Sequence, residues 1–432
     1  MLGGGSFTAQ NKTLPGAYIN FVSAASSVAV LSDRGTAAIP LEFGWGPEKE
    51  AFIVTAQDYQ ERCQEIFGYP ADAPQMWMIR ELFRNLTKGI FYRLNAGVKA
   101  ACDYGQARYS GVRGKDLTLV VSANVDDSTK FDVRTLLDRK EVDHQTVAAA
   151  TELTDNRYVV FKKDATLAAT AGMPFTGGTD GDAVTGEDYA RFLAKMESHT
   201  FQTLCCPSMD DAVKAVFEEY TKRMRDEAGV KFQTVMYRNA GADYEGIISV
   251  ENKAAEQEQG LVYWTTGAQA ACAVNKTNEN RVYDGELTVD VDYTQGQLSA
   301  GVRSGKFMFH RVGDDVRVLM DINTLTTFTE EKGEDFSGNQ TIRVLDQIGN
   351  DIASMFNTKY LGIMPNDDAG RVSLWNDIVT YNKELARLRA IEAVEAKEIT
   401  VGRGNSKRSV VVNCPVTPIN CMSQLYMTVV VS

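Results

Sequence analysis

The chain has 432 residues, of which 44% are hydrophobic and 24% charged, and its formal net charge is −12. This composition is typical of a globular protein with ample core material, and the length predicts about two to four domains. The acidic net charge argues against a protein whose main task is to hold nucleic acid, because that task needs a clustered basic face. No stretch has the apolar length that crosses a bilayer. We therefore expect no nucleic acid partner and no membrane insertion.

The amino terminus and the cysteines indicate the compartment in which the protein folds. Residues 1–6 lack the basic start and apolar core of a signal peptide. The seven cysteines are odd in number and irregularly spaced, which does not fit a disulfide framework. Both observations predict a protein that is made and folded in a cytoplasm.

Residues 1–22 are predicted to form a linking arm and a strand. The first part is rich in Gly, Ser, Asn and Gln, and the following run alternates apolar and polar side chains, as strands do. The strand residues are Ala17, Tyr18, Ile19, Asn20, Phe21 and Val22. Such a strand pairs either with the body of its own subunit or with a neighbouring subunit.

Helices and strands alternate in residues 23–96 and again in residues 172–320. Thr55 and Thr185 each precede an aspartate by three positions, a capping-box pattern that predicts a helix start. Apolar strand-like runs follow the predicted helices. This alternation favours a layered α/β middle domain with helices on the faces of a sheet.

Residues 97–171 interrupt that alternation. Short β-branched runs such as 117–121 and 131–133 are separated by Asp, Asn, Gly and Lys turns, and no amphipathic helix is evident. We predict a small all-β outer domain inserted into the α/β domain.

Residues 321–432 are predicted to form a carboxy-terminal α/β assembly module with two amphipathic helices and a hairpin. The hairpin strand residues are Ile399, Thr400, Val401, Val410, Val411 and Val412. The chain then ends in an uncharged run of high strand propensity. Its residues are Leu425, Tyr426, Met427, Thr428, Val429, Val430 and Val431. A hairpin leaves a free edge on each side, and this terminal strand can fill one edge in its own subunit or in a neighbour's.

The fold class expected from these elements is therefore α/β (α+β) and multidomain. It has a layered core, an inserted all-β domain and a carboxy-terminal module that extra strands complete.

The sequence contains only weak matches to the motifs of nucleotide-binding, metal-binding and catalytic sites. The glycine-rich run 177–181 lacks the lysine and hydroxyl of a phosphate-binding loop, and the run 301–307 has the wrong spacing for one. His199 with Cys205 and Cys206 is the nearest approach to a metal cluster, but adjacent cysteines in an apolar strand are more often core residues. We predict no catalytic residue, no metal site and no cofactor.

Short motifs spread along the chain carry a family resemblance. They lie at residues 14–19, 34–37, 45–47, 175–181, 322–326, 342–346, 366–371 and 425–429. Taken in order, they resemble the contractile tail sheath proteins of phages and of phage-tail-like bacteriocins. The resemblance covers nearly the whole chain apart from the predicted β insertion, which varies widely in such proteins.

The resemblance implies a structural subunit, not an enzyme. Such a subunit polymerises as a helical tube around an inner tail tube and contracts to drive that tube through a target cell envelope. The resemblance further implies that residues 17–22 and 425–431 are donated to neighbouring subunits, and that the hairpin 399–413 accepts such strands. The resemblance fits the tail of a phage and the tail of a headless bacteriocin particle equally well.

The implied partners are further copies of the chain, the inner tail tube protein, and baseplate and tail terminator proteins. The implied location is the host bacterial cytoplasm during assembly and then the tail of the released virion or bacteriocin particle. Such sheaths contact their tubes through the carboxy-terminal domain, so basic residues of its second helix are candidates for that contact. These are Arg371, Lys383, Arg387 and Arg389, and a simply solvated helix face explains them equally well.

Two alternatives remain open. Sheath middle domains are related in fold to subtilisin-like hydrolases, although no serine here lies in a recognisable nucleophile motif. Another self-assembling array, such as a surface layer, is the second alternative, and the absence of a secretion signal argues against it.

Overall fold

The computed structural model describes residues 31–431, which divide into two compact units. The core unit contains Asp33–Asn350, Arg389–Ile391 and residues 417–431. The hairpin unit contains residues 31–32, Asp351–Leu388 and Glu392–Val416. The predicted strand at residues 17–22 lies outside the described residues.

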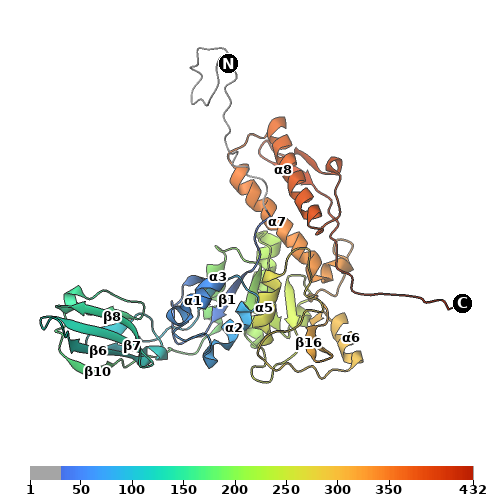
Figure 1. Cartoon of the computed structure of the whole chain (residues 1–432). Helices are drawn as coiled ribbons and strands as arrows, with labels where there is room; N and C mark the ends of the chain where they lie inside the picture. The colour runs from blue at the N-terminus through green and yellow to red at the C-terminus, as the bar shows by residue number, and fades with distance from the viewer. Residues whose placement is uncertain (1–30, 432) are drawn as a thin grey trace, which may run out of the picture. The chain divides into compact units, whose positions relative to one another are not determined.

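The core unit is built on a seven-stranded sheet (Figure 1) with the order β14-β13-β12-β11-β1-β3-β2. The strands are β1 (Thr36–Leu41), β2 (Ala51–Thr55), β3 (Lys88–Arg93), β11 (Thr203–Cys206), β12 (Gln233–Tyr237), β13 (Ile247–Val250) and β14 (Lys306–Phe307). All neighbours pair in parallel except β2 and β3. Because successive side chains point to opposite faces, Ala37 and Ile39 join one core while Ala38 joins the other.

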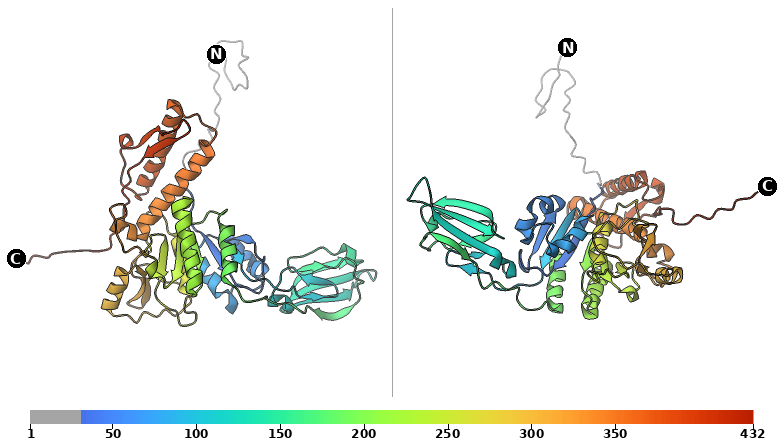
Figure 2. Two further views of the ribbon diagram at one scale, coloured as in Figure 1. Left: turned by 180° about the vertical axis from the view of Figure 1, so that it is seen from behind. Right: turned by 60° about the horizontal axis from the view of Figure 1, so that its bottom comes forward.

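Helices cover both faces of this sheet (Figures 1 and 2). One core includes side chains of α1 (Ala56–Phe67), α2 (Trp77–Phe83) and α5 (Leu261–Ala271). The other includes side chains of α3 (Gly186–Met196) and α4 (Asp211–Lys222), which a π turn at Arg223–Glu227 extends. Thr55 and Thr185 form the predicted capping boxes. The layered α/β core is thereby confirmed.

Two smaller parts complete the core sheet region. Helix α6 (Gln295–Arg303) precedes β14, and a two-stranded sheet of β15 (Phe309–Val312) and β16 (Asp315–Val318) follows it. Among the helices that the structure describes, none is both long and apolar enough to cross a membrane.

The inserted region consists of two sheets that share one core. The four-stranded sheet contains β6 (Leu117–Ala123), β7 (Phe131–Leu137), β8 (Lys140–Val147) and β10 (Thr170–Pro174), and its pairs are antiparallel (Figure 1). The three-stranded sheet contains β4 (Ala101–Cys102), β5 (Gly105–Ala107) and β9 (Val159–Phe161). Leu119, Val133 and Phe161 lie in the shared core. This region is the all-β insertion expected from the sequence.

The glycine-rich run at 177–181 is explained by the close approach of two chain segments. The backbone amide of Thr179 donates to the carbonyl of Val98 at 3.1 Å, and the side-chain amide of Asn95 donates to the carbonyl of Asp180 at 3.2 Å. A Cβ atom on Gly97 would lie 2.1 Å from the Thr179 carbonyl oxygen. Glycine therefore lets the segments that enter and leave the insertion run side by side.

The hairpin unit contains the predicted helices and hairpin. Helix α7 (Asn339–Lys359) begins in the core unit and continues into the hairpin unit, where α8 (Asp368–Arg387) follows. Strands β17 (Thr400–Arg403) and β18 (Val410–Asn413) form a two-stranded antiparallel sheet.

Two buried ion pairs fix the first half of α7 in the core unit. Arg225 contacts Asp346 through two hydrogen bonds of 2.6 and 2.8 Å. Arg343 contacts Asp321 at 3.1 Å, and both side chains are 1% exposed. Because each buried charge has a partner, the polar start of α7 is accommodated inside the fold.

Candidate functional site

The hairpin is held on α8 at both of its ends. The indole Nε1 of Trp375 donates to the carbonyl of Ile399 at 2.8 Å, just before β17. At the turn, the side-chain amide of Asn366 donates to the carbonyls of Ser409 at 2.9 Å and Lys407 at 3.1 Å. Asp367 then caps α8 by accepting the amide of Gly370 at 2.8 Å. The sequence around the α8 start therefore positions the hairpin.

Both edges of the hairpin carry outward-pointing backbone groups. Gly404 donates its amide to the carbonyl of Ser409 at 2.9 Å. Because hydrogen-bonded and non-hydrogen-bonded pairs alternate in an antiparallel ladder, the registered pairs Arg403↔Val410 and Val401↔Val412 point their amides and carbonyls away from each other. Within residues 31–431 no third strand pairs with either edge. The hairpin can therefore receive one added strand on each side.

The structure places five of the six predicted hairpin residues in the strands. Thr400 and Val401 lie in β17, and Val410, Val411 and Val412 lie in β18. Ile399 instead lies one residue before β17, is 3% exposed and gives its carbonyl to Trp375. Ile399 therefore anchors the hairpin and does not contribute to its edge.

The terminal run at residues 425–431 is not a strand in the single chain, although its composition predicts one. Its six apolar side chains are 70–90% exposed, and the run has no regular secondary structure. Figure 1 shows it as an extended trace that leaves the core unit. A strand requires a partner edge, and the described part of this chain provides none to the run. Residues 425–431 thus have high strand propensity but pair with no strand among the described residues.

The segment just before this run is attached to the start of α7. The amide of Ile419 donates to the carbonyl of Ala390 at 2.9 Å. Gln340 donates to the carbonyl of Ile419 at 3.0 Å and accepts the amide of Cys421 at 3.0 Å. Ser423 also contacts Glu279. The extended terminal segment consequently starts from a fixed point near residue 421.

The four basic candidates for tube contact do not form one group. Arg371 donates to the backbone and side-chain oxygens of Asn366 at 3.1 and 3.0 Å and also contacts Asp368. Lys383, Arg387 and Arg389 are exposed at the other end of α8, where Arg387 pairs with Glu384 at 2.6 Å. Arg371 and Lys383 lie twelve positions apart along the helix, which corresponds to roughly 18 Å. The structure therefore assigns Arg371 to the α8 start and Lys383 and Arg387 to its last turns, while Arg389 follows the helix and belongs to the core unit.

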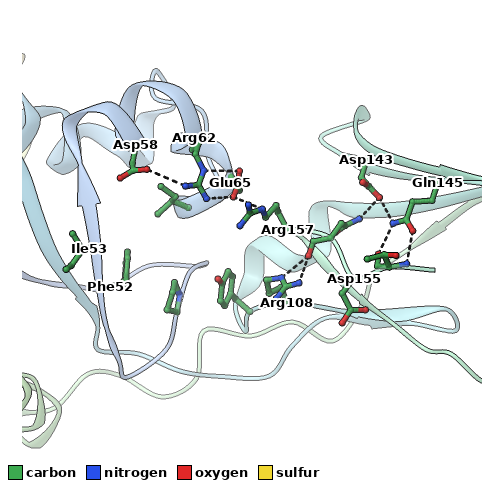
Figure 3. Close-up of a pocket in the computed structure, with 15 residues that line it drawn as sticks. Phe52, Ile53, Asp58, Arg62, Glu65, Arg108, Asp143, Gln145, Asp155 and Arg157 are labelled. Carbon is green, nitrogen blue, oxygen red and sulfur yellow. Dashed lines mark hydrogen bonds and ion pairs between the residues drawn. The ribbon is translucent and has the colours of Figure 1, made fainter. Parts of the chain in front are cut away.

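A cavity of about 780 Å³ lies between α1 and the inserted strands (Figure 3). Arg62 contacts Glu65 at 2.7 Å and Asp58 at 3.4 Å, and Arg157 contacts Glu65 at 3.0 Å. Arg108 donates to the carbonyl of Asn156. These charged groups satisfy one another, and the lining residues include no serine, cysteine or histidine that could act as a nucleophile or base with them.

The weak metal candidate is a core feature. Cys205 and Cys206 are fully buried in β11, and burial raises the pKa of the Cys206 thiol to about 12. A thiol with so high a pKa is a poor metal ligand at neutral pH, because the thiolate is the ligating form. Among the described residues, no group of three or more His, Cys, Asp or Glu side chains is arranged to hold a metal ion.

Comparison with known proteins decides the family. Family models match the phage tail sheath β-sandwich domain at residues 95–180, the phage tail sheath central domain at 182–324 and the phage tail sheath C-terminal domain at 331–432. The chain is also 32% identical to the phage-like element PBSX protein XkdK of Bacillus subtilis, over the whole of both chains. The chain belongs to the phage tail sheath family.

Solved structures agree with the tail sheath assignment. The sheath tail protein of Desulfitobacterium hafniense superimposes with a TM-score of 0.81 at 36% identity, covering 94% of this chain and 98% of that one. The anti-feeding prophage helical sheath in its contracted state matches with a TM-score of 0.54 at 12% identity, covering 97% and 99% of the two chains. The second likeness establishes the fold alone.

The protein is therefore a structural subunit of a contractile tail sheath and not an enzyme. Its place is in the tail of a phage or of a tail-like particle, where sheath subunits assemble with copies of themselves. Nothing in the comparisons supports a hydrolase or a surface-layer protein.

Two features of this tail sheath hairpin unit were not predicted. Asn366 was noted only as part of a motif, yet it holds the hairpin turn. The second feature is the exposed apolar side chains of Leu361, Ile363 and Met364 in the segment between α7 and α8, and exposed apolar residues that lie together often mark an interaction surface.

Proposed function

We propose that this tail sheath protein polymerises by strand exchange. Residues 17–22 and 425–431 are donated to neighbouring subunits, and β17 and β18 accept such strands on their two edges. Repetition of this head-to-tail contact produces an open helix, because the contact does not close on itself. Four parts of the chain then have separate roles in the sheath. They are the amino-terminal arm, the middle domain at 23–96 and 172–320, the inserted domain at 97–171 and the assembly domain at 321–432.

One observation carries this proposal: two open edges and one exposed, uncharged segment coexist in the same chain. Val401 and Val410 present unpaired backbone groups on opposite edges. Leu425 and Val431, at the ends of the terminal segment, are 85% and 90% exposed. An exposed apolar segment and an unfilled strand edge are both unfavourable in an isolated subunit, and both are relieved when strands pair between copies.

The remaining partners follow from the same role. We assign the inner tail tube to the lumen of the sheath, with Lys383, Arg387 and Arg389 as the contact residues, and the baseplate and tail terminator proteins to its two ends. Assembly takes place in the host bacterial cytoplasm. During contraction the strand links hold, and subunits move as rigid bodies while their other contacts change.

Negative-stain electron microscopy of the purified chain, with and without residues 425–432, tests strand exchange. With tail tube supplied, we expect hollow helical sheaths from the full chain and soluble monomers from the truncated chain. A variant that replaces Met422 by Ser is the matched control, because it removes an exposed apolar side chain outside the proposed strand. Normal sheaths from the truncated chain would refute the proposal.

A further inference from the structure

An apolar cavity of the hairpin unit lies beside the start of β18. Its volume is about 420 Å³, and its wall includes Phe356, Tyr360, Met364, Pro365, Leu374 and Val410. We call this cavity the hairpin groove. It is within the range of about 300–1,000 Å³ that is typical of small-ligand pockets. The groove therefore has room for a large side chain.

The hairpin directs an added strand toward this groove. Val410 is both the first residue of β18 and part of the groove wall. Its backbone groups, like those of Val412, point to the outer edge. Residues directly opposite each other in a ladder share a face, so a strand paired with β18 places every second side chain on the face of Val410. At the Val410 end, such a side chain meets the groove.

Residues 425–431 have the alternation that this geometry requires. One face of the segment as a strand is wholly apolar, and its residues are Leu425, Met427, Val429 and Val431. The other face carries the hydroxyl groups of Tyr426 and Thr428. The segment also has no cation that the groove's basic residues, Lys407 and Arg408 among them, would repel.

We propose that residues 425–431 of a second copy pair with the outer edge of β18, and that Leu425 or Met427 fills the hairpin groove. The inference rests on the proposed strand exchange and adds to it the edge, the inward face and the anchoring pocket. The groove turns a contact made of backbone hydrogen bonds into one that also selects side chains.

A binding experiment on the chain that lacks residues 425–432 tests the pocket. A fluorescently labelled peptide of residues 422–432 is titrated into it and followed by anisotropy. We expect saturable binding that M427D in the peptide weakens about ten- to hundredfold, the loss that corresponds to one buried apolar side chain. The peptide variant T428D, on the opposite face, should bind as the unchanged peptide does.

The matched pair on the acceptor side is L361D and V372D. Both side chains lie in the hairpin unit and are similarly exposed, at 60% and 56%, but only Leu361 lines the groove. Because both are surface positions, both variants should fold. We expect L361D to weaken the peptide about ten- to hundredfold and V372D to leave binding unchanged.

Equal effects of L361D and V372D, or no binding of the unchanged peptide, would overturn the groove inference. Displacement of the bound peptide by one of residues 14–24 would overturn it as well, because the amino-terminal strand would then be the occupant. These peptide-binding results test only the groove inference. The proposed strand exchange is tested separately, by whether the truncated chain still forms sheaths.

Discussion

The indole Nε1 of Trp375 donates a hydrogen bond of 2.8 Å to the carbonyl of Ile399, a residue that is 3% exposed. This bond joins the middle of α8 to the start of β17. The half-buried indole of Trp375 thus attaches one end of the proposed acceptor hairpin to α8, while Asn366 holds the turn at the other end.

Replacement of Trp375 by Phe should loosen the hairpin without removing the ring from the interface. The carbonyl of Ile399 loses its partner in a buried place, which costs about 1–3 kcal/mol. Hydrogen exchange at the amides of Gly402 and Val411, which pair across the ladder, should become faster. Trp77→Phe in the core unit is the control, and equal exchange in both variants would contradict the role of the indole.

The buried pair of Arg225 and Asp346 should be essential for the stability of the core unit. The two side chains are 4% and 10% exposed, so Asp346→Ala leaves a buried guanidinium without its carboxylate. Loss of one partner of such a pair costs about 3–5 kcal/mol. Urea unfolding should report this loss, and the double variant R225M/D346L should recover part of it, since it removes both charges. A single variant as stable as the unchanged chain would contradict this account.

Asp243 should make the loop at 326–327 sensitive to acid. Its carboxylate accepts the amides of Thr326 at 2.6 Å and Thr327 at 2.9 Å, and hydrogen bonds from Thr327 and Thr326 lower its pKa to about 2. A pKa lowered in the folded state stabilises the fold above the unfolded pKa, which is about 3.9, and this contribution is lost as the pH falls through about 2.

The comparison of the chain with its Asp243→Asn variant measures that contribution. The difference in the free energy of unfolding should be largest above pH 4 and should shrink as the pH falls toward 2. A difference that stays constant over this window would show that another group is responsible.

Reversal of the exposed charges at the end of α8 tests tube contact. Arg387→Glu together with Arg389→Glu should weaken attachment to tail tubes, with an effect that diminishes at high salt, while the sheath still assembles with itself. Lys195→Glu with Arg303→Glu, two exposed cations of the core unit, is the control. Unchanged co-sedimentation of the first variant with tubes would discard this contact.

Most helices and strands could be predicted from sequence patterns that involve only neighbouring residues. The capping boxes at Thr55 and Thr185 and the spacing of apolar residues in α7 and α8 depend on neighbours three or four positions apart, so the sequence predicts them directly. The strand order of the core sheet depends on distant pairings, and the antiparallel β2 at its edge was not anticipated.

Several features of the candidate site could not be predicted from local sequence patterns. The hairpin follows from β-branched runs around a polar turn, but the anchoring of Ile399 by Trp375 joins residues 24 positions apart. Residues 425–431 have strand propensity, yet pairing depends on an edge that propensity does not supply. The groove arises only where a helix end, a loop and the hairpin turn meet.

The attachment of residues 419–421 to Gln340 also determines how mechanical tension passes through a subunit. A pull on the terminal segment enters the fold at the second residue of α7 and reaches the hairpin unit, which begins at Asp351, after roughly 17 Å of this helix. The inserted sheets join the core unit through the adjacent segments near Val98 and Thr179, away from that route. Under the proposed strand exchange, the inserted sheets can therefore vary in size and sequence, or carry an added peptide, without weakening the links between successive subunits.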